Sequence, residues 1–387
     1  PLDERPAAPL IGWGPYGKHS PTHMPTHFPK AEVTEETISR HTAFEAVDPM
    51  YWVPRGYAVI DVDPRGTWYS EGKATFHSPE EARDYYDLIE WAGTRDWSNG
   101  KVGLAGVSYL ASAQWHAAAQ KPPHLAAINP WEGWTDLYRE IARHGGIPET
   151  HFWPYLPERW GRSVTEVEDL RLETAERPFF DDYWASKIAD LEAIEVPAFV
   201  VASWSDQGVH TRGTLEGFRR LGSKQKWLMV HGRKKWSHFY DPDSVRRQSE
   251  FFDHFLLGKE TGLSDWPRVE VEVRRSYYVG DMLVSTDWPL PETVRRALYL
   301  DAASGSLGEA VPEPASASYD PGSSDQATSR LVFDHTFAAD TTLVGHMKLQ
   351  LFLSAETADD ADIFVAVQKR DRQGNPVFFP VQSQYED

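Results

Sequence analysis

The sequence predicts an α/β protein with a mostly parallel sheet crossed by helices, an inserted helical segment and a second, antiparallel β domain. Short apolar runs alternate with amphipathic segments over residues 1–130 and again over 195–260, which is typical of a parallel sheet with helical crossovers. Between them, residues 131–194 are helical in pattern and rich in tryptophan, and this predicts a cap over the sheet. From 264 to 387, apolar and polar residues alternate with period two, which predicts a β-sandwich.

The first core segment supplies three strands and two helices in order. Apolar runs at 8–15 and 56–63 predict the first two buried strands. Ser78 begins a helix as its N-cap, since Pro and Glu follow within the first turn, and this helix ends near Gly93. A third strand and an Ala-rich helix then meet at Ser108.

The second core segment continues the sheet. Residues 125–130 predict a short strand before the cap, and apolar runs at 196–204 and 226–232 predict two more strands after it. A helix is expected around 214–221 between these strands. An amphipathic helix over 243–257 ends the segment at a glycine.

The β domain is predicted from segments that alternate apolar and polar residues at 268–275, 347–354 and 362–370. A long loop rich in Ala, Ser, Pro and Gly over 302–328 separates them. The pattern is unfinished at the last residue, and the first residue is not Met. We therefore expect the chain to be incomplete at both ends.

Composition and charge narrow the classes of function. The 387 residues are 25% charged and 41% hydrophobic, as in soluble globular proteins, and no apolar run approaches the roughly 20 residues of a membrane span. A net charge of −19 without a basic stretch argues against binding to nucleic acid or to an anionic membrane. The absence of cysteine excludes disulfides, thiolate metal sites and a cysteine nucleophile. We expect a cytoplasmic protein without a cofactor, and its self-association as a homo-oligomer stays open.

The N-terminal loop carries three histidines at a spacing of four, His19, His23 and His27. On a helix this spacing would indicate a metal-binding face. The prolines between them exclude a helix, so we predict a surface loop and no metal site.

The turn at Ser108 is the candidate for chemistry. A serine held on a sharp turn between a strand and a helix has its hydroxyl raised above the sheet. The common G-x-S-x-G pattern is incomplete, because Leu110 stands where the second glycine is usual, although Gly106 and Ala111 are small. A serine that only caps its helix explains the same residues, and this motif alone leaves both interpretations open.

A nucleophilic serine needs a histidine base and an acid that orients the base. In α/β-hydrolases they follow in the order serine, acid, histidine, each beyond the end of a strand. Asp206 follows the strand at 196–204, and His238 follows the strand at 226–232. We therefore predict the catalytic triad Ser108, Asp206 and His238.

Other candidates for these roles fit the order less well. His231 lies at the very end of a strand and reads as a structural histidine. Asp181 and Asp182 belong to the cap, before the strand that should precede the acid. His116 lies on the helix two turns beyond Ser108 and cannot turn back to the hydroxyl.

The oxyanion of an acyl transfer needs two hydrogen-bond donors. The amide of Tyr109, directly after the nucleophile, is the first. The loop after the first strand offers the phenol of Tyr16 as the second. A tyrosine packed in this loop explains the residue equally well, so its role stays open on these grounds.

Several motifs together resemble the CocE/NonD hydrolases, which include cocaine esterase, the α-amino acid ester hydrolases, glutaryl-type acylases and, more distantly, the Xaa-Pro dipeptidyl peptidases. The motifs are WGPYGKHS, YAVIDVDPRGTWYSEG, KVGLAGVSYL, WSDQG and WSHF. The resemblance implies an α/β-hydrolase domain with a helical cap and a C-terminal jelly roll. It also implies Ser108 as nucleophile, Asp206 and His238 as its relay, and the Tyr16 hydroxyl with the Tyr109 amide as oxyanion donors. The chain departs from the family at Ala111, where glycine is common.

Specificity is predicted less sharply. Glu132 and Asp136 follow the strand after the nucleophile helix and could hold a substrate ammonium, or they could be solvated or tether the cap. Tryptophans could line an acyl pocket or pack cap against core; they are Trp131, Trp134, Trp153, Trp160 and Trp204.

The prediction is a serine hydrolase that cleaves carboxylic esters or amides of small molecules through an acyl-enzyme. An Xaa-Pro dipeptidyl aminopeptidase is the alternative enzyme, and it needs an acidic site for a free α-amino group. A non-catalytic binding protein that uses its β domain is the alternative from another class, and it predicts no covalent labelling of Ser108.

Overall fold

The computed structural model describes residues 6–19, 23–356 and 358–379. Packing divides them into two compact units. The first holds the chain up to Trp288 together with the residues from Phe352 onward, and the second is Pro289–Leu351.

The first unit is built on an eight-stranded sheet with the strand order β10-β9-β8-β7-β4-β3-β1-β2. Neighbouring strands from β2 to β9 run parallel, and β10 alone pairs antiparallel, with β9. The strands are β1 (Ala8–Trp13), β2 (Tyr57–Val62), β3 (Val102–Val107), β4 (Leu125–Trp131), β7 (Ala198–Ser203), β8 (Lys226–His231), β9 (Val269–Ser276) and β10 (Val279–Ser285). The predicted parallel sheet is confirmed.

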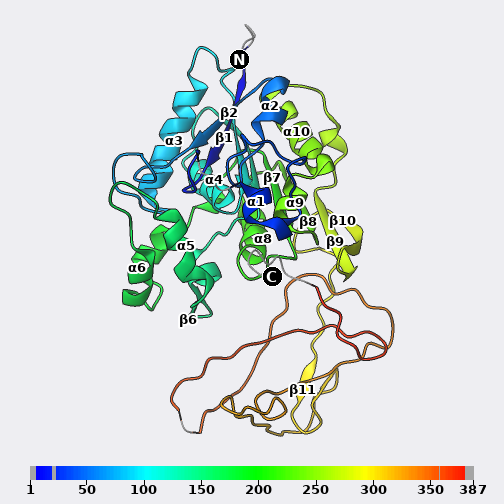
Figure 1. The fold of residues 1–387 in the computed structure, drawn as a ribbon. Coiled ribbons are helices and arrows are strands. Elements are labelled where there is room, and N and C mark those ends of the chain that lie inside the picture. The colour runs from blue at the N-terminus through cyan, green and yellow to red at the C-terminus, as the bar shows by residue number, and fades with distance from the viewer. Residues whose placement is uncertain (1–5, 20–22, 357, 380–387) are drawn as a thin grey trace. The chain divides into compact units, whose positions relative to one another are not determined.

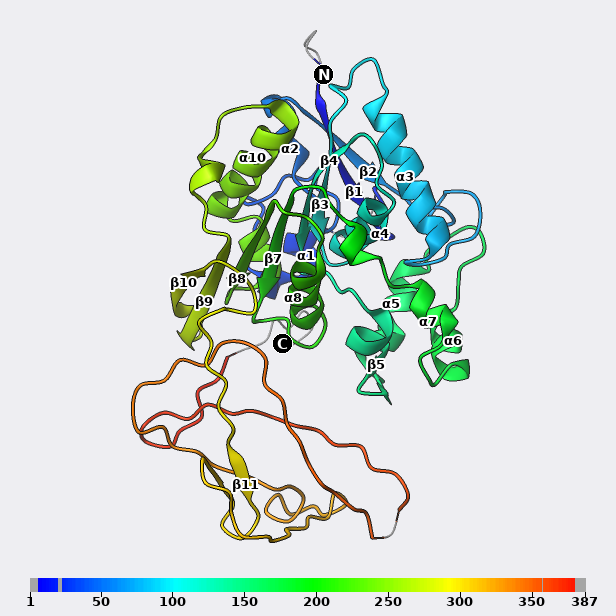
Figure 2. The ribbon, with the colours of Figure 1, turned by 180° about the vertical axis from the view of Figure 1, so that it is seen from behind.

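Helices flank the sheet on both sides (Figures 1 and 2). The long ones are α3 (Pro79–Gly93), α4 (Tyr109–Ala119), α8 (Thr211–Arg220) and α10 (Pro242–Leu257). The shorter ones are α1 (Met24–His27), α2 (Pro49–Trp52), α7 (Asp182–Ser186) and α9 (Lys235–Phe239), with 3-10 turns at Pro29–Ala31, Val53–Arg55, Leu191–Ala193 and Gly262–Asp265.

Two helix ends follow the rules that predicted them. The Ser78 hydroxyl accepts a hydrogen bond from the Glu81 amide at 3.1 Å, with Pro79 in the first turn of α3. Gly258 ends α10 in the left-handed conformation, at φ 66°, which glycine adopts without steric cost.

The segment between β4 and β7, which the sequence predicts to be a helical cap, combines short helices with a hairpin and irregular stretches. It contains a π-helical turn (Tyr138–Ala142), a short hairpin of β5 (Arg143–His144) and β6 (Ile147–Pro148), and helices α5 (Phe152–Trp160), α6 (Leu170–Glu176) and α7. Its tryptophans are buried: the Trp153 indole donates to the Thr174 hydroxyl at 2.8 Å, and Trp160 is fully enclosed.

The histidine loop differs from the prediction, because α1 forms a short helix at Met24–His27 despite Pro25. Proline is tolerated there because its missing N–H would have no partner in the first turn of a helix. The Nδ1 atom of His23 lies 3.3 Å from Glu35. Within the described residues, no group of three or more potential metal ligands comes together.

The C-terminal region carries antiparallel strands, as predicted, but β9 and β10 extend the central sheet. The Val269 and Val271 side chains of β9 are fully buried against it. In the second unit, β11 (Tyr299–Asp301) pairs antiparallel with β12 (Ser306–Gly308).

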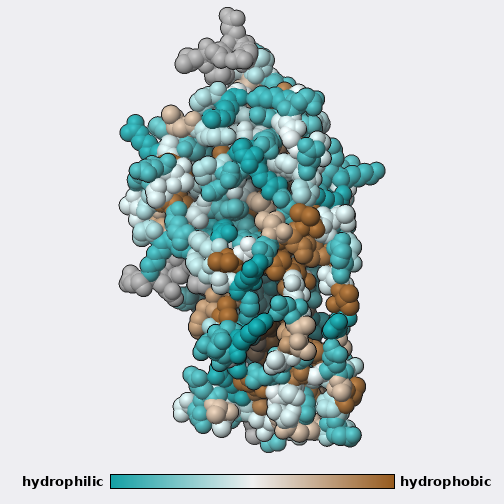
Figure 3. Space-filling view, turned by 90° about the vertical axis from the view of Figure 1, so that its right-hand side faces the viewer, coloured by the Kyte–Doolittle hydropathy of each residue, from teal (hydrophilic) through white to brown (hydrophobic). Residues whose placement is uncertain are grey.

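The predicted strands at 347–354 and 362–370 are not strands among the described residues. Their apolar side chains are exposed, 97% for Phe352 and 82% for Phe364. On the face seen in Figure 3, hydrophobic side chains reach the surface among hydrophilic ones. An alternating pattern becomes a strand only when a neighbouring strand accepts its hydrogen bonds.

None of the helices in the described ranges combines the length and the apolar character that a membrane span requires.

Candidate active site

Ser108 lies on the sharp turn that the sequence predicts, between the end of β3 and the start of α4. Its φ of 61° and ψ of −116° are unusual for a residue with a side chain, and such strain concentrates at functional sites. Backbone hydrogen bonds hold the turn on both sides: the Val107 amide donates to the Glu45 carbonyl, and the Ser108 amide donates to the Trp131 carbonyl, each at 3.0 Å.

The incomplete glycine pattern has a packing explanation. A Cβ atom on Gly106 would lie 2.5 Å from the Cβ of Leu110, and one on Gly14 would lie 2.4 Å from its Cδ1. Leu110 therefore fills space that these two glycines leave open. Ala111 must stay small, because a Cβ on Gly133 would lie 3.0 Å from the Cβ of Ala111.

A chain of two hydrogen bonds begins at the Ser108 hydroxyl. Its Oγ lies 3.0 Å from Nε2 of His210, and Nδ1 of His210 lies 2.6 Å from Oδ2 of Asp206. With a proton on Nδ1, the imidazole donates to the carboxylate and its free Nε2 accepts from the serine. This is the arrangement in which a histidine can remove the proton from a serine hydroxyl.

The loop after β7 supplies both the acid and the histidine. The amides of Val209, His210 and Thr211 all donate to the Asp206 carbonyl, at 3.3, 2.9 and 3.2 Å. This tight turn precedes α8 and brings side chains four residues apart to the same side. The Trp134 ring stacks on the His210 ring with centroids 5.5 Å apart and supports the orientation of the imidazole.

His238, the histidine predicted for this role, lies elsewhere. It stands on α9 with its ring 4.1 Å from that of His231 and 5.9 Å from that of Trp131, measured between centroids. Its Nε2 is buried and makes no hydrogen bond with any described residue, and burial holds its pKa well below the usual value. The predicted pairing of Ser108 with His238 is thus replaced by the pairing with His210, because α9 directs residue 238 toward β8.

Lys235, which the sequence did not single out, stands at the start of α9 and points toward the acid. Its Nζ lies 2.9 Å from Oδ2 of Asp206, the same oxygen that bonds to His210. Burial opposes ionisation of Asp206, but His210 and Lys235 outweigh it and hold the pKa of this carboxyl well below its usual range. Burial also lowers the pKa of His210, against the attraction of Asp206. The histidine is therefore poised as a neutral base beside an ionised acid.

Tyr16 is buried next to the serine. The Trp160 indole donates to its hydroxyl at 3.3 Å, and the Ser108 side chain is among the groups that act on the pKa of this phenol. Burial, with Glu45 nearby, raises the pKa of this phenol, so it keeps its proton and can donate. The phenol of Tyr109 is bonded to Glu81 at 2.8 Å, and its amide stands at the first position of α4.

The two carboxylates considered for binding a substrate ammonium, Glu132 and Asp136, already have other surroundings. Glu132 is fully buried at φ 52°, with its Oε1 3.2 Å from Nε2 of His231, and burial raises its pKa to about 8. Asp136 forms an ion pair with Arg139 at 2.6 Å.

The predicted tryptophans lie in several places. Trp134 and Trp160 stack on each other beside the site, with centroids 5.9 Å apart. Trp153 packs against Trp160 inside the cap. Trp131 packs against Phe239 in the core, whereas Trp204 is partly buried and its indole donates to a β9 carbonyl.

Glu45 is another buried carboxylate near the site, and the sequence analysis did not name it. Its Oε1 accepts from the Trp236 indole at 2.9 Å, Oε2 has no hydrogen-bond partner among the described residues, and burial raises its pKa to about 7. No sequence motif marks Glu45 or Lys235. His210 does carry a signal: it follows Asp206 by four residues in a short loop directly after a strand.

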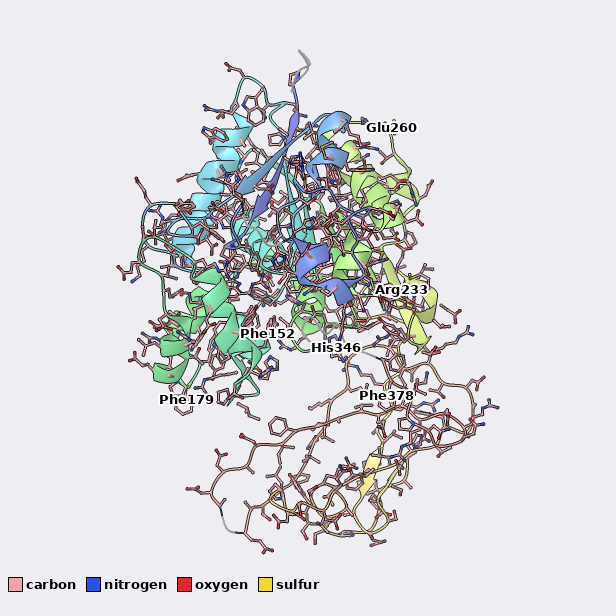
Figure 4. The ribbon with its side chains drawn as sticks, viewed as in Figure 1. Phe152, Phe179, Arg233, Glu260, His346 and Phe378 are labelled. Atoms are coloured by element: carbon pink, nitrogen blue, oxygen red, sulfur yellow. The ribbon has the colours of Figure 1, made fainter. Side chains whose placement is uncertain are left out.

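A cavity of about 460 Å³ lies beside the same loop. It is lined by Tyr138, Arg139, Glu140, His144, Gly145, Gly146, Gln207, Val209 and Arg212. Arg212 pairs with the buried Glu140 at 2.7 Å. The side chains of this region and of the neighbouring loops are drawn in Figure 4, where the labelled Arg233 follows the end of β8.

Comparison with known proteins shows which families this chain resembles. Residues 4–160 match the family described as X-Pro dipeptidyl-peptidase (S15 family), and residues 261–381 match its C-terminal non-catalytic domain. A crystal structure of a CocE/NonD family hydrolase from Staphylococcus aureus is 40% identical and superposes with a TM-score of 0.76, over 80% of this chain and 56% of that one. The chain is similar to the CocE/NonD hydrolases and to the S15 family of X-Pro dipeptidyl-peptidases.

The curated proteins similar to this chain include enzymes of two kinds. Cocaine esterase of a Rhodococcus strain is 27% identical over 66% of this chain and 54% of its own length. The Xaa-Pro dipeptidyl-peptidase of Streptococcus gordonii is 24% identical over 68% of this chain and 36% of its own length. The chain thus spans about half the length of the relatives that it matches, or less.

Proposed function

We propose that this protein is a serine hydrolase that cleaves carboxylic esters or amides of small molecules through an acyl-enzyme. The observation that carries the proposal is the pair of hydrogen bonds from Ser108 through His210 to Asp206, at 3.0 and 2.6 Å. Similarity to families of hydrolases supports the reaction class.

In the first half-reaction, Nε2 of His210 takes the proton from Oγ of Ser108 as Oγ bonds to the substrate carbonyl carbon. The carbonyl oxygen becomes an oxyanion, held by the Tyr16 hydroxyl and the Tyr109 amide. Each such donor contributes about 3–4 kcal/mol to transition-state stabilisation. Asp206 stabilises the imidazolium without accepting its proton.

Collapse of the tetrahedral intermediate breaks the bond to the leaving alcohol or amine, which takes the proton from His210. Water then attacks the acyl-enzyme, with His210 as base again. The proton returns to Oγ of Ser108 as the carboxylic acid product leaves, so no co-reactant besides water is needed.

Covalent labelling by a fluorophosphonate tests the proposal. We expect mass spectrometry to locate the label on Ser108, and Ser108→Ala to abolish it. Ser112→Ala is the matched control, because Ser112 lies on the same helix and its hydroxyl accepts from the Trp134 amide, away from the nucleophile role. Labelling of another serine in Ser108→Ala, or no labelling and no ester turnover, would contradict the proposal; the second outcome would favour a binding protein.

The second candidate is an Xaa-Pro dipeptidyl aminopeptidase, which the match of residues 4–160 favours. Such an enzyme must hold a free α-amino group. Glu132 is enclosed and Asp136 is paired with Arg139, which makes both poor candidates for this task. Comparing a p-nitrophenyl ester with a Gly-Pro anilide separates the two activities: we expect turnover of the ester and little of the anilide.

A further inference from the structure

One buried cation next to the triad has no part in the reaction sequence above. Lys235 lies at the start of α9, in the loop after β8 that was predicted to supply the histidine. Lys235 is only 4% exposed, and its ammonium lies 2.9 Å from Oδ2 of Asp206. A buried lysine is costly unless it is paired, so its place at this oxygen calls for a reason.

The loop geometry supplies that reason. Asp206 and His210 come from a single short turn after β7, and Lys235 reaches the Asp206 carboxylate from a second loop, the one after β8. Among the described residues, the hydrogen bonds to the Asp206 carboxylate come from His210 and Lys235 alone. Lys235 is thus the contact from outside the β7 loop that sets the direction of the carboxylate.

The charges around this pair determine what the ammonium does. The groups that act on His210 are Asp206 and Lys235, with Glu132 at the end of β4. Lys235 itself faces three carboxyls, Asp206, Glu45 and Glu132. Burial opposes the charge of Lys235, but these carboxyls outweigh it and raise its pKa, so the ammonium persists.

Two cations act on Glu45, Lys235 and Arg159 of α5, and one anion, Asp206, opposes its ionisation. Burial favours the protonated forms of Glu45 and Glu132 over their charged forms. Lys235 is therefore the fixed positive charge next to Asp206, whereas these two carboxyls change their charge near neutral pH.

We propose that Lys235 is a positioning residue of the catalytic site: its ammonium holds Asp206 Oδ2 against His210 and, as a positive charge, keeps the imidazole neutral at lower pH. This rests on the proposed function, because it assigns Lys235 a role only through Asp206 and His210. Lys235 takes no proton and touches no reacting atom.

The test measures the rate of fluorophosphonate labelling of Ser108 between about pH 4.5 and 9. Labelling requires neutral His210, so the rate rises with pH through the pKa of that histidine. Removing a positive charge favours the imidazolium and raises this pKa. We expect Lys235→Gln, which keeps a donor for Asp206 but no charge, to move the rise to higher pH by about one unit.

Two further variants separate this role from simple stabilisation. Lys235→Arg keeps the charge, so the rise in labelling rate should stay near the wild-type pH. Labelling should be slower, because the larger guanidinium does not hold Asp206 in the same position. Lys187→Gln is the matched control: Lys187 is also buried and pairs with Glu168 at 2.9 Å, away from His210. It should lower the melting temperature and leave the pH profile in place. Lys235→Met covers the case in which the Gln variant does not fold, with the same expected shift.

The outcomes distinguish this inference from the function on which it rests. Label on Ser108 with the shifted profile in the uncharged variants supports both. Label on Ser108 with a wild-type profile in Lys235→Gln or Lys235→Met overturns the role of Lys235 and leaves the serine hydrolase intact. Absence of label on Ser108 in the wild-type protein overturns both.

Discussion

The loops after β7 and β8 each contain a histidine, but the two side chains point to different parts of the molecule. Each has a histidine within about seven residues of its strand end: His210 after β7 and His238 after β8. The first donates to Asp206 and reaches Ser108, whereas the second packs on His231 in the core. The β8 loop instead sends Lys235 to the acid. The difference shows that the direction of the first turn after a strand, rather than the order along the chain, decides which histidine contacts Ser108.

Exchanging the histidines for alanine is the largest test of this comparison. We expect His210→Ala to lower kcat by about 10⁴ or more, because Ser108 loses its base. His238→Ala should keep kcat within a few-fold of the wild type and lower stability through lost packing against His231. Ester turnover and thermal melting of both variants measure the two effects. The opposite ranking of the two activities would return the role of base to the β8 loop.

Asp206→Asn tests the acid that the β7 loop supplies. The amide cannot accept the Nδ1–H bond in the same way and carries no charge to stabilise the imidazolium, so we expect kcat to fall by about 10³ to 10⁴. Asp241→Asn is the control from the neighbouring loop, because Asp241 caps α10 through the Asp243 amide at 3.0 Å. It should keep its activity. Steady-state kinetics of both variants on one ester measures the two kcat values. Equal values would contradict the role of Asp206 as the acid.

Tyr16→Phe removes a donor that comes from the loop after β1, outside both compared loops. We expect kcat to fall roughly a hundredfold while folding is preserved, since one oxyanion donor is lost. Tyr85→Phe is matched, because the Tyr85 hydroxyl is buried without a hydrogen-bond partner among the described residues. Tyr85→Phe should keep the kcat of the wild-type protein. An unchanged kcat of Tyr16→Phe on a p-nitrophenyl ester would remove Tyr16 from the mechanism.

The last test concerns the stability of the protein and Glu132, which directly follows β4. Burial raises its folded pKa to about 8, above the ordinary carboxyl value near 4.5. Its contribution to stability is therefore complete below pH 4.5 and is lost as the pH rises toward 8.

Glu132→Gln does not titrate, so we expect its stability relative to the wild type to grow by about 1.4 kcal/mol per pH unit at most over this window. Denaturant melts at pH 5, 6.5 and 8 measure the change. His231 faces Glu132 with a pKa lowered to about 3 by burial, so it stays neutral over this window in the folded protein. A stability difference that does not vary with pH would show that Glu132 ionises freely in the folded protein.

Much of the site could be predicted because local rules act within a few residues. A strand, a serine and an Ala-rich helix in succession predict the strained turn at Ser108. An aspartate directly after a buried strand predicts Asp206. The base was missed because His210 and His238 both follow strands, and the preference for the histidine after the later strand rested on the usual order of these elements.

The same contrast holds for the sheet. The alternating pattern of 268–275 correctly predicts a strand but not its neighbour, and β9 pairs with β8 rather than only within a separate β domain. At 347–354 the pattern is as regular, yet the described residues form no strand there. A sequence pattern states which face of a strand is apolar, whereas the partner strand comes from elsewhere in the chain.

By itself, the sequence determined the parallel α/β core, the turn at Ser108, the place of Asp206 after β7 and the caps that begin α3 and end α10. Only the tertiary structure decided which histidine meets Ser108, that Lys235 shares the acid, and that Glu132 is enclosed. The physical reason is the separation along the chain over which each interaction acts. Turn conformation, capping and apolar periodicity depend on neighbours in the chain, whereas a hydrogen bond between residues 108 and 210 depends on how two loops are directed after the whole sheet has formed.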